Sequence, residues 1–403
     1  MSFFLLSIVT SATPSYSISV LEHSPTPVLS GSNAKGHGAA PDGCIVFNPS
    51  FIPSSPTFNQ SGVLVRMCCG SSCTGHGASL DPHAQAAERI GFAPCDLESG
   101  TCGDVLPSSV FNLDPTSDTE DPRAFYFDSM YYNFYYRGVH AGSKCSGPQC
   151  TVRLSKTATP LDAASWKEIA TFPVRDWRSN SVPSHPSAPS AINVPCSIPP
   201  LEQWHRNGCC AMQPRGKRSF CIWGEGPDPF PGLGISYTTD IDSGIFTQAS
   251  WSVATGVDSP LTADASYLLP LGASQQEVKL EAGTHMLQLS TGDWLHFYAA
   301  ATPGWVPNGN YTAGFIILDR DDPTRIIQRS GPHVLIPFYD YETLCGGAAE
   351  CKYRGERKNV IFLCSATRMA SRGGTETDRI RLFFGGGDGN VGTAVVEVTP
   401  ARG

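Results

Sequence analysis

Two adjacent carboxylates, a proline and a guanidinium stand together in the segment Glu120-Asp121-Pro122-Arg123. Two short aromatic stretches follow at once, at 124–127 and 130–136. Aromatic residues favour strands and proline fixes the backbone, so this order predicts an acid presented beside a sheet, at the mouth of a pocket. Sugar chemistry uses such an acid, because the departing oxygen needs a proton. Neighbouring side chains on an extended segment face opposite ways, so we expect different roles for Glu120 and Asp121.

The composition favours one all-β domain. The chain has 403 residues with 40 Gly and 33 Pro, and only 16% of its residues are charged. This mixture is typical of many short strands joined by turns. The net charge is −8 without a basic stripe, which argues against a nucleic-acid partner. No stretch after the N-terminus is long and apolar enough to predict a membrane span, and no spacing predicts a metal site or a cofactor.

Fifteen cysteines and the N-terminus together predict a secreted protein or one in the lumen of the secretory pathway. Disulfides are favoured over zinc, because the Cys-Cys doublets do not fit the spacing of structural zinc sites. An apolar run at 3–9 suggests a signal peptide or N-terminal extension over 1–17, although no Lys or Arg precedes it. Asn59 and Asn310 begin glycosylation sequons. Three cysteine pairs are close in sequence: Cys95 with Cys102, Cys145 with Cys150, and Cys345 with Cys351.

Similar apolar strands recur along the chain at intervals of roughly 70 to 90 residues. They lie at 62–67, 130–137, 219–224, 293–299 and 379–385. A second strand with small residues follows most of them, at 150–155, 234–238, 311–318 and 392–398. Five repeats of a multi-stranded sheet predict a five-bladed β-propeller over 18–403, with a two-sheet sandwich as the alternative. In a propeller the inner strands converge on one axis, so Arg66, Asp121 and Asp388 are expected to be neighbours. Asp388 would follow the last inner strand.

These pieces together resemble glycoside hydrolase family 130, which contains β-mannoside phosphorylases and mannosidases built on a five-bladed propeller. The resemblance extends over about residues 44–398 and rests on the order of several short motifs. The most specific is the Glu-Asp-Pro-Arg segment with the aromatic strand after it. The other matches lie at Gly283 and in the segments 47–50, 63–66, 293–295, 314–323, 335–337, 341–342, 359–362 and 384–388.

The resemblance implies that Asp121 is the general acid, and a raised pKa would let it donate a proton at neutral pH. The resemblance also implies a donor-sugar pocket, whose lining residues would bind sugar hydroxyls or brace the loop: Asn48, Arg66, Glu120, Arg123 and Asp388. An oligosaccharide or polysaccharide would be the substrate. Each acid also has a purely structural alternative: Asp121 could pair with Arg123 or cap a turn, and Asp388 could simply form one.

The chain departs from the family at the residues that bind phosphate. Phosphorylases of the family carry a His in the fourth-blade strand and further cations in the third blade. Here the run 294–298 leads into Ala299-Ala300, where that His would stand, and the segments 206–210 and 223–225 stand where the third blade's Lys and later Arg would be expected. Each charge-assisted contact contributes roughly 1.5–3 kcal/mol, so their loss favours hydrolysis over phosphorolysis. Single-displacement hydrolysis needs a second carboxylate to activate water, and Glu281 is the first candidate, with Glu225 as the other.

Three alternatives stay open at this point. The protein could be a β-mannoside phosphorylase, a carbohydrate-binding propeller without activity, or a glycosidase of a neighbouring five-bladed family that acts on arabinans or fructans.

Overall fold

The structure of the chain is a computed structural model. The residues that it describes are 16–31, 38–40, 44–69, 88–106, 117–139, 151–172, 208–212, 218–223, 225–227, 233–249, 251–254, 279–302, 310–331, 333–344, 359–370 and 376–401.

Strands dominate the described residues and form five sheets. The first sheet contains β4 (Cys44–Ile52), β5 (Gly62–Cys69) and β6 (Glu88–Pro94). The second contains β7 (Ser117–Phe127), β8 (Met130–Val139), β9 (Thr151–Thr157) and β10 (Lys167–Phe172). The third contains β11 (Gly208–Met212), β12 (Ser219–Trp223), β14 (Gly234–Thr238) and β15 (Thr247–Ala249).

The last two sheets are larger. The fourth contains β13 (Glu225–Pro227), β16 (Ser252–Val253), β17 (Lys279–Ala282), β18 (Leu287–Gln288), β19 (Trp294–Ala301), β20 (Tyr311–Leu318) and β21 (Arg325–Arg329). The closing sheet contains β1 (Tyr16–His23), β2 (Leu29–Ser30), β3 (Gly38–Ala39), β22 (Ile361–Arg368), β23 (Asp378–Gly386) and β24 (Asn390–Pro400). Helix in the described chain is limited to α1 (Asp340–Thr343) and two 3-10 turns, Ala163–Ser165 and Ile241–Ser243. None of the helices described could span a membrane.

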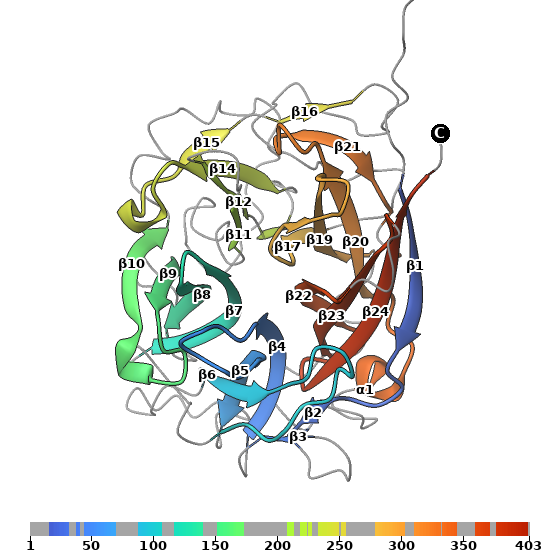
Figure 1. Cartoon of the computed structure of the whole chain (residues 1–403). Coiled ribbons are helices and arrows are strands. Elements are labelled where there is room, and N and C mark those ends of the chain that lie inside the picture. Colours follow the sequence, from blue (N-terminus) through green and yellow to red (C-terminus); the bar gives the residue numbers. More distant parts are fainter. Residues whose placement is uncertain are drawn as a thin grey trace, which may run out of the picture.

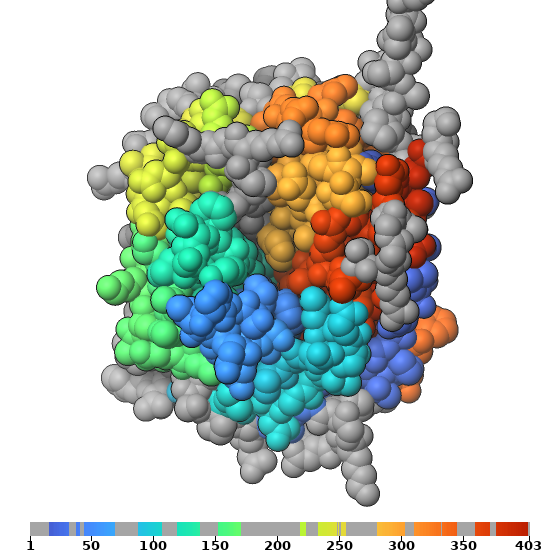
Figure 2. Space-filling view, in the orientation of Figure 1, coloured from blue at the N-terminus to red at the C-terminus, as the bar shows by residue number. Residues whose placement is uncertain are grey.

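The sheets stand around a common centre, as in a propeller (Figure 1). The strands nearest the centre are β4, β7, β11, β17 and β22, and β10, β15 and β1 lie at the periphery. On the face shown in Figure 2, the first sheet (blue) lies between the second (green) and the closing sheet (red). In the described residues four sheets have the four or more strands of a full blade, and the first sheet has three. The all-β, propeller-like architecture predicted from the sequence is therefore confirmed.

Neighbouring sheets are held together by their own clusters of buried apolar side chains. Leu64, Phe92 and Tyr131 join the first sheet to the second. Phe134 and Cys221 belong to the cluster between the second and third sheets. The remaining clusters join the third sheet to the fourth, the fourth to the closing sheet, and the closing sheet back to the first. Burial of both faces of each sheet explains why the apolar runs are longer than simple alternation would give.

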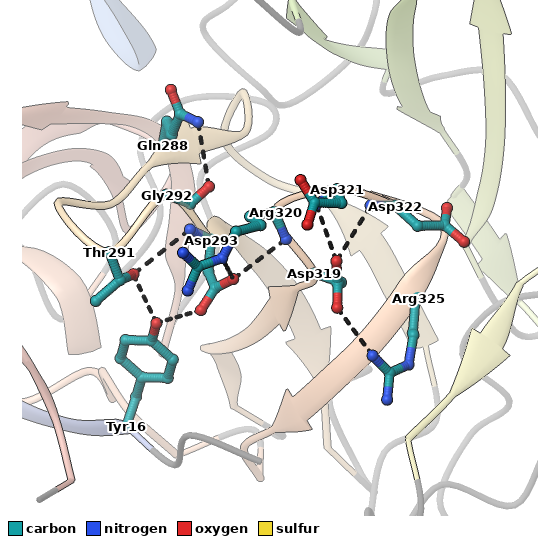
Figure 3. A network of polar contacts seen from close by, with 10 residues as sticks. All are labelled: Tyr16, Gln288, Thr291, Gly292, Asp293, Asp319, Arg320, Asp321, Asp322 and Arg325. Carbon is teal, nitrogen blue, oxygen red and sulfur yellow. Dashed lines mark hydrogen bonds and ion pairs between the residues drawn. The ribbon is translucent and has the colours of Figure 1, made fainter. Parts of the chain in front are cut away.

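The N-terminal strand β1 completes the closing sheet, where it pairs antiparallel with β24. It crosses the boundary expected at residue 17, because β1 begins at Tyr16. The Tyr16 hydroxyl donates to the buried Asp293 carboxylate and lies 2.7 Å from Thr291 Oγ1, as Figure 3 shows. The Gln328 side chain bonds the backbone N–H and C=O of Tyr16 at 2.6 and 2.7 Å. The first described residue of the chain thus ties the closing sheet to the fourth.

Asp293 and the segment 319–323 carry part of the family resemblance, and here their contacts support the scaffold. Asp293 Oδ1 accepts the backbone N–H of Arg320 at 3.1 Å. Asp319 Oδ1 accepts the N–H groups of Asp321 and Asp322, and its Oδ2 pairs with Arg325 at 2.9 Å (Figure 3). These contacts fix the turn between β20 and β21.

All five recurring strands are present, each in a different sheet, as β5, β8, β12, β19 and β23. Their predicted partners are also strands, namely β9, β14, β20 and β24. The expectation that Asp388 follows an inner strand is wrong. It follows β23, which is the second strand of its sheet, and β22 lies nearer the centre. Each recurring strand has a neighbouring strand on both sides and therefore carries a strong apolar pattern. The apolar pattern consequently marks the middle of a sheet and does not show which strand lies nearest the centre of the molecule.

Cysteine chemistry is described for part of the chain. Cys95 and Cys102 form a disulfide with each other, as their spacing suggested. Cys44 and Cys68 each take part in a disulfide as well. Cys145, Cys150, Cys345 and Cys351 lie outside the described residues.

Candidate active site

Two backbone irregularities on inner strands bring Asn48 and Asp121 together. Asn48 lies in a register shift between β4 and β5, and Asp121 lies in one between β7 and β8. Both have a positive φ, 49° for Asn48 and 52° for Asp121. Asn and Asp tolerate this conformation best among residues with a side chain, and each such residue costs about 1–3 kcal/mol. The result is a hydrogen bond from Asn48 Nδ2 to Asp121 Oδ1 of 2.7 Å.

Arg66 on β5 is the centre of the charged cluster. Its Nη1 donates to Asp121 Oδ1 at 2.9 Å, and its Nη2 lies 2.8 Å from Glu120 Oε2. Both Nε and Nη2 donate to Glu88 Oε2, at 3.0 and 2.6 Å. One face of the guanidinium lies over the Phe47 ring, with Cζ 4.7 Å from the ring centroid. Arg66 therefore joins three carboxylates from two neighbouring sheets.

Arg123 connects the second sheet to the far side of the centre. It is buried, and its Nε donates to the carbonyl of Gly283, which follows β17, at 2.8 Å. Its Cζ lies 5.1 Å from the centroid of Phe362 on β22. Its backbone N–H donates to Asn133 Oδ1 at 3.0 Å. Arg123 thus contacts the fourth and closing sheets and contributes a positive charge beside Asp121.

The pKa of Asp121 is below its ordinary value, so the raised pKa expected from the sequence is wrong. Burial raises this pKa, but the charges of Arg66 and Arg123 and hydrogen bonds from Asn48 and Arg66 lower it by more. Asp121 is consequently a carboxylate at neutral pH.

The fourth sheet supplies another buried acid and two histidines. Glu281 on β17 is buried, and its backbone is paired with that of Glu225 on β13. His296 on β19 is fully buried, and burial lowers its pKa to about 3. Burial also lowers the pKa of His285 to about 4. Both imidazoles are therefore neutral at physiological pH.

The closing sheet approaches Asn48 through its glycines. A Cβ on Gly385 would lie 2.3 Å from Asn48 Oδ1, so only glycine allows this approach. Asp388 lies in the turn after β23 with a φ of 49°. Its strand therefore ends close to the Asn48 side of the cluster.

The structure brings together four of the residues predicted from the sequence: Asn48, Arg66, Glu120 and Asp121. Sequence reasoning missed Glu88 and the contact between Arg123 and the carbonyl of Gly283. Glu88 is paired with Cys68 in the β5–β6 register, so it lies diagonally across from Arg66 on the same face. Pairing of β5 with β6 would have predicted that Glu88 lies beside Arg66. The 18 residues 70–87 separate the two strands in sequence, so this pairing could not be recognised from the sequence.

Comparisons with known proteins agree with this architecture. No protein-family model matches the chain. A 1,2-beta-oligomannan phosphorylase from Thermoanaerobacter sp. (strain X514) is 25% identical over 131 residues, which are 32% of this chain and 37% of that protein. The match thus spans little more than a third of that relative's length.

Several solved structures share the fold. One was solved in work which states that the GH130 family of mannoside phosphorylases contains glycoside hydrolases that target β-1,2-mannosidic linkages in Candida mannan. It has a TM-score of 0.60 and 14% identity, and the alignment covers 96% of this chain and 94% of that one. A glycosyl hydrolase from Bacteroides ovatus gives 0.55 and 16%, over 87% and 84% of the two chains. The β-1,2-mannobiose phosphorylase from Listeria innocua, solved with β-1,2-mannobiose, gives 0.53 and 13%, over 88% and 90%. The resemblance of this chain to glycoside hydrolase family 130 is therefore confirmed, with the family's mannoside phosphorylases and glycoside hydrolases as its structural neighbours.

Proposed function

We propose that this protein is a glycosidase that hydrolyses β-mannosides or related glycans by single displacement, with Asp121 as the general acid. The observation that supports this best is the buried Asp121 carboxylate, held by Asn48 and Arg66 on a strained bulge at the centre of the ring. We also propose that the five sheets are the blades of a five-bladed propeller, since each neighbouring pair shares a core cluster.

The proposed reaction needs two carboxyl groups in different protonation states. A bound sugar would exclude water from Asp121. Burial already acts to raise the pKa of this carboxyl, and the loss of water would strengthen that effect and favour the protonated acid. Asp121 would donate its proton to the leaving oxygen, while Glu281 would take a proton from the attacking water. Asn48, Arg66, Glu120 and Asp388 would bind sugar hydroxyls. Arg123 would chiefly hold the pocket together, because its guanidinium bonds backbone carbonyls of Gly283 and Pro122.

Hydrolysis is proposed ahead of phosphorolysis because the positive charge of Arg66 is already paired with three carboxylates. Phosphorolysis is the second candidate, since the 25%-identical relative is a phosphorylase. Release of mannose 1-phosphate only in the presence of inorganic phosphate would establish phosphorolysis and overturn hydrolysis.

Replacement of Asp121 by Asn tests the acid. For an unactivated β-mannoside we expect kcat to fall by about 10²–10⁴-fold, because the leaving oxygen loses its proton donor. For an aryl mannoside whose phenol leaves without protonation, the loss should be much smaller. Turnover is measured with and without phosphate, together with sugar binding by calorimetry, and Glu120→Gln serves as the neighbouring-acid control.

Other outcomes of the same experiment would redirect the proposal. A wild-type protein that binds mannosides without any turnover would be a carbohydrate-binding propeller. Turnover of arabinosides or fructosides but not mannosides would assign a different substrate class.

We further propose that the protein is secreted or lumenal. The Cys95–Cys102 disulfide needs an oxidising compartment, and the sequon residues Asn59 and Asn310 are both exposed. Secretion of the native protein, with a mass increase that a glycosidase removes, would test this.

A further inference from the structure

We infer that Glu88 is a specificity-determining residue that keeps anions out of the pocket by occupying the edge of the Arg66 guanidinium that would otherwise bind them. The inference concerns the pocket on which the proposed function depends, and it narrows the substrate class to neutral glycans.

The geometry of Arg66 carries the inference. An arginine presents its donors as a planar fork, and the edge formed by Nε and Nη2 is the one that grips a carboxylate or a phosphate with two bonds. Glu88 Oε2 accepts from both nitrogens of this edge. The neighbouring donors point to Glu120 and Asp121, and the Phe47 ring covers one face. All three guanidinium nitrogens thus lie within 3.0 Å of a carboxylate oxygen of the protein.

The charge of the cluster acts in the same direction. Arg66 and Arg123 supply two positive charges, and Glu88, Glu120 and Asp121 supply three negative ones. The side chains of Arg66 and its three carboxylates are only 11–18% exposed, so solvent screens their charges weakly. His285 and His296, on the fourth sheet, add no charge because burial lowers their pKa. Among these groups one negative charge remains, which repels phosphate, uronates and phosphorylated sugars.

Glu88 is distinct from the two acids of the Glu-Asp-Pro-Arg segment. It comes from β6 of the first sheet, whereas Glu120 and Asp121 come from β7 of the second. Its removal should therefore leave Asp121 in place on its bulge, held by Asn48. The Nε–Nη2 edge of Arg66 would then be free of Glu88, with Glu120 Oε2 still 2.8 Å from Nη2.

Inorganic phosphate is the probe, and its binding to the purified full chain is measured by isothermal titration calorimetry near neutral pH. We expect wild type to bind phosphate weakly or not at all. Glu88→Gln removes the charge, and Glu88→Ala also clears the edge. We expect binding to become about tenfold tighter in Glu88→Gln and tighter still in Glu88→Ala.

Two controls make the result specific. Glu376→Gln removes the same charge at an exposed position and should bind phosphate no better than wild type. Arg66→Gln in the Glu88→Ala background should abolish the gained binding. Thermal melting of each variant confirms that it is folded.

The inference is overturned if wild type binds phosphate as tightly as the Glu88 variants. It is equally overturned if neither variant gains binding, or if the gain survives loss of Arg66. Because the readout is binding of an anion, it does not depend on turnover. Failure of the proposed hydrolysis would appear separately, as absence of sugar release by a wild-type protein that still excludes phosphate.

Discussion

Two buried ionisable side chains of this molecule, Asp121 and His296, both have a lowered pKa, but for different physical reasons. Asp121 has a lowered pKa because two guanidinium groups overcome its burial. His296 has a lowered pKa because burial disfavours its charged form. A carboxylate with a lowered pKa adds stability that is lost as the pH falls through its folded-state value. A histidine that is buried neutral also makes the protein less stable in acid, because only the unfolded chain can take up its proton.

The pH dependence of stability should therefore change when His296 is replaced. The unfolded histidine titrates near pH 6.5 and the folded one near 3, so between these values unfolding takes up one proton at His296. As the pH is lowered from 6.5 towards 3, we expect His296 alone to reduce the free energy of unfolding of wild type by about 1.4 kcal/mol for each pH unit. His296→Gln should remove one proton from the slope, as measured by urea unfolding between pH 7.5 and 4.5. The exposed His333, replaced by Gln, is the control. An unchanged slope in His296→Gln would contradict the burial of a neutral imidazole.

Single elements place the acid through their irregularities. The bulges in β4 and β7 turn Asn48 and Asp121 toward each other, and β23 approaches Asn48 closely enough to exclude a side chain at Gly385. Three sheets thus determine the position of one carboxylate. A change in the closing sheet should reach Asp121 through Asn48.

Gly385→Ala tests this connection between elements. The added methyl group would lie 2.3 Å from Asn48 Oδ1 and 3.1 Å from Asn48 N, so Asn48 must move. We expect a loss of stability of about 1–3 kcal/mol. Turnover should also fall, because Asn48 donates to Asp121. Gly331→Ala is the control, since nothing lies within 4 Å of its added Cβ. Melting temperature and glycan turnover are measured for both. Full activity of Gly385→Ala would show that the position of Asn48 does not matter.

Some of these elements could be predicted from the sequence and some could not. The recurring strands were predictable because strands buried on both faces give continuous apolar runs, as in the stretch that became β23. The inner strands β4 and β17 were not, because β4 is interrupted by a bulge and β17 is only four residues long, whereas the stretch 124–127 of β7 was predicted as a strand. Asp121 was found because its acidic motif is contiguous. Glu88 and the contact between Arg123 and the carbonyl of Gly283 were missed because Glu88 and Gly283 approach Arg66 and Arg123 from strands or turns distant in sequence.

At the scale of the whole molecule, the first and last strands of the described chain pair with each other and complete the closing sheet. β1 is the N-terminal strand of the described chain, and it pairs with β24, the last strand. Tyr16 then reaches past its own sheet to the fourth, where Asp293, Thr291 and Gln328 bind it. The contacts of Tyr16 therefore hold the closing sheet against the fourth sheet.

Tyr16→Phe removes this closure contact with the least change in shape. The buried Asp293 carboxylate loses a hydroxyl donor, and an unsatisfied buried polar group costs about 1–3 kcal/mol. We expect the melting temperature and the free energy of unfolding to fall. Activity well below the melting temperature should be unchanged, because none of these residues lies in the Arg66–Asp121 cluster. Tyr126→Phe removes a hydroxyl from a partly buried ring at the β7–β8 hairpin, so it controls for the loss of a phenol elsewhere. Equal stability of Tyr16→Phe and wild type would show that strand pairing between β1 and β24 closes the ring without the Tyr16 hydroxyl.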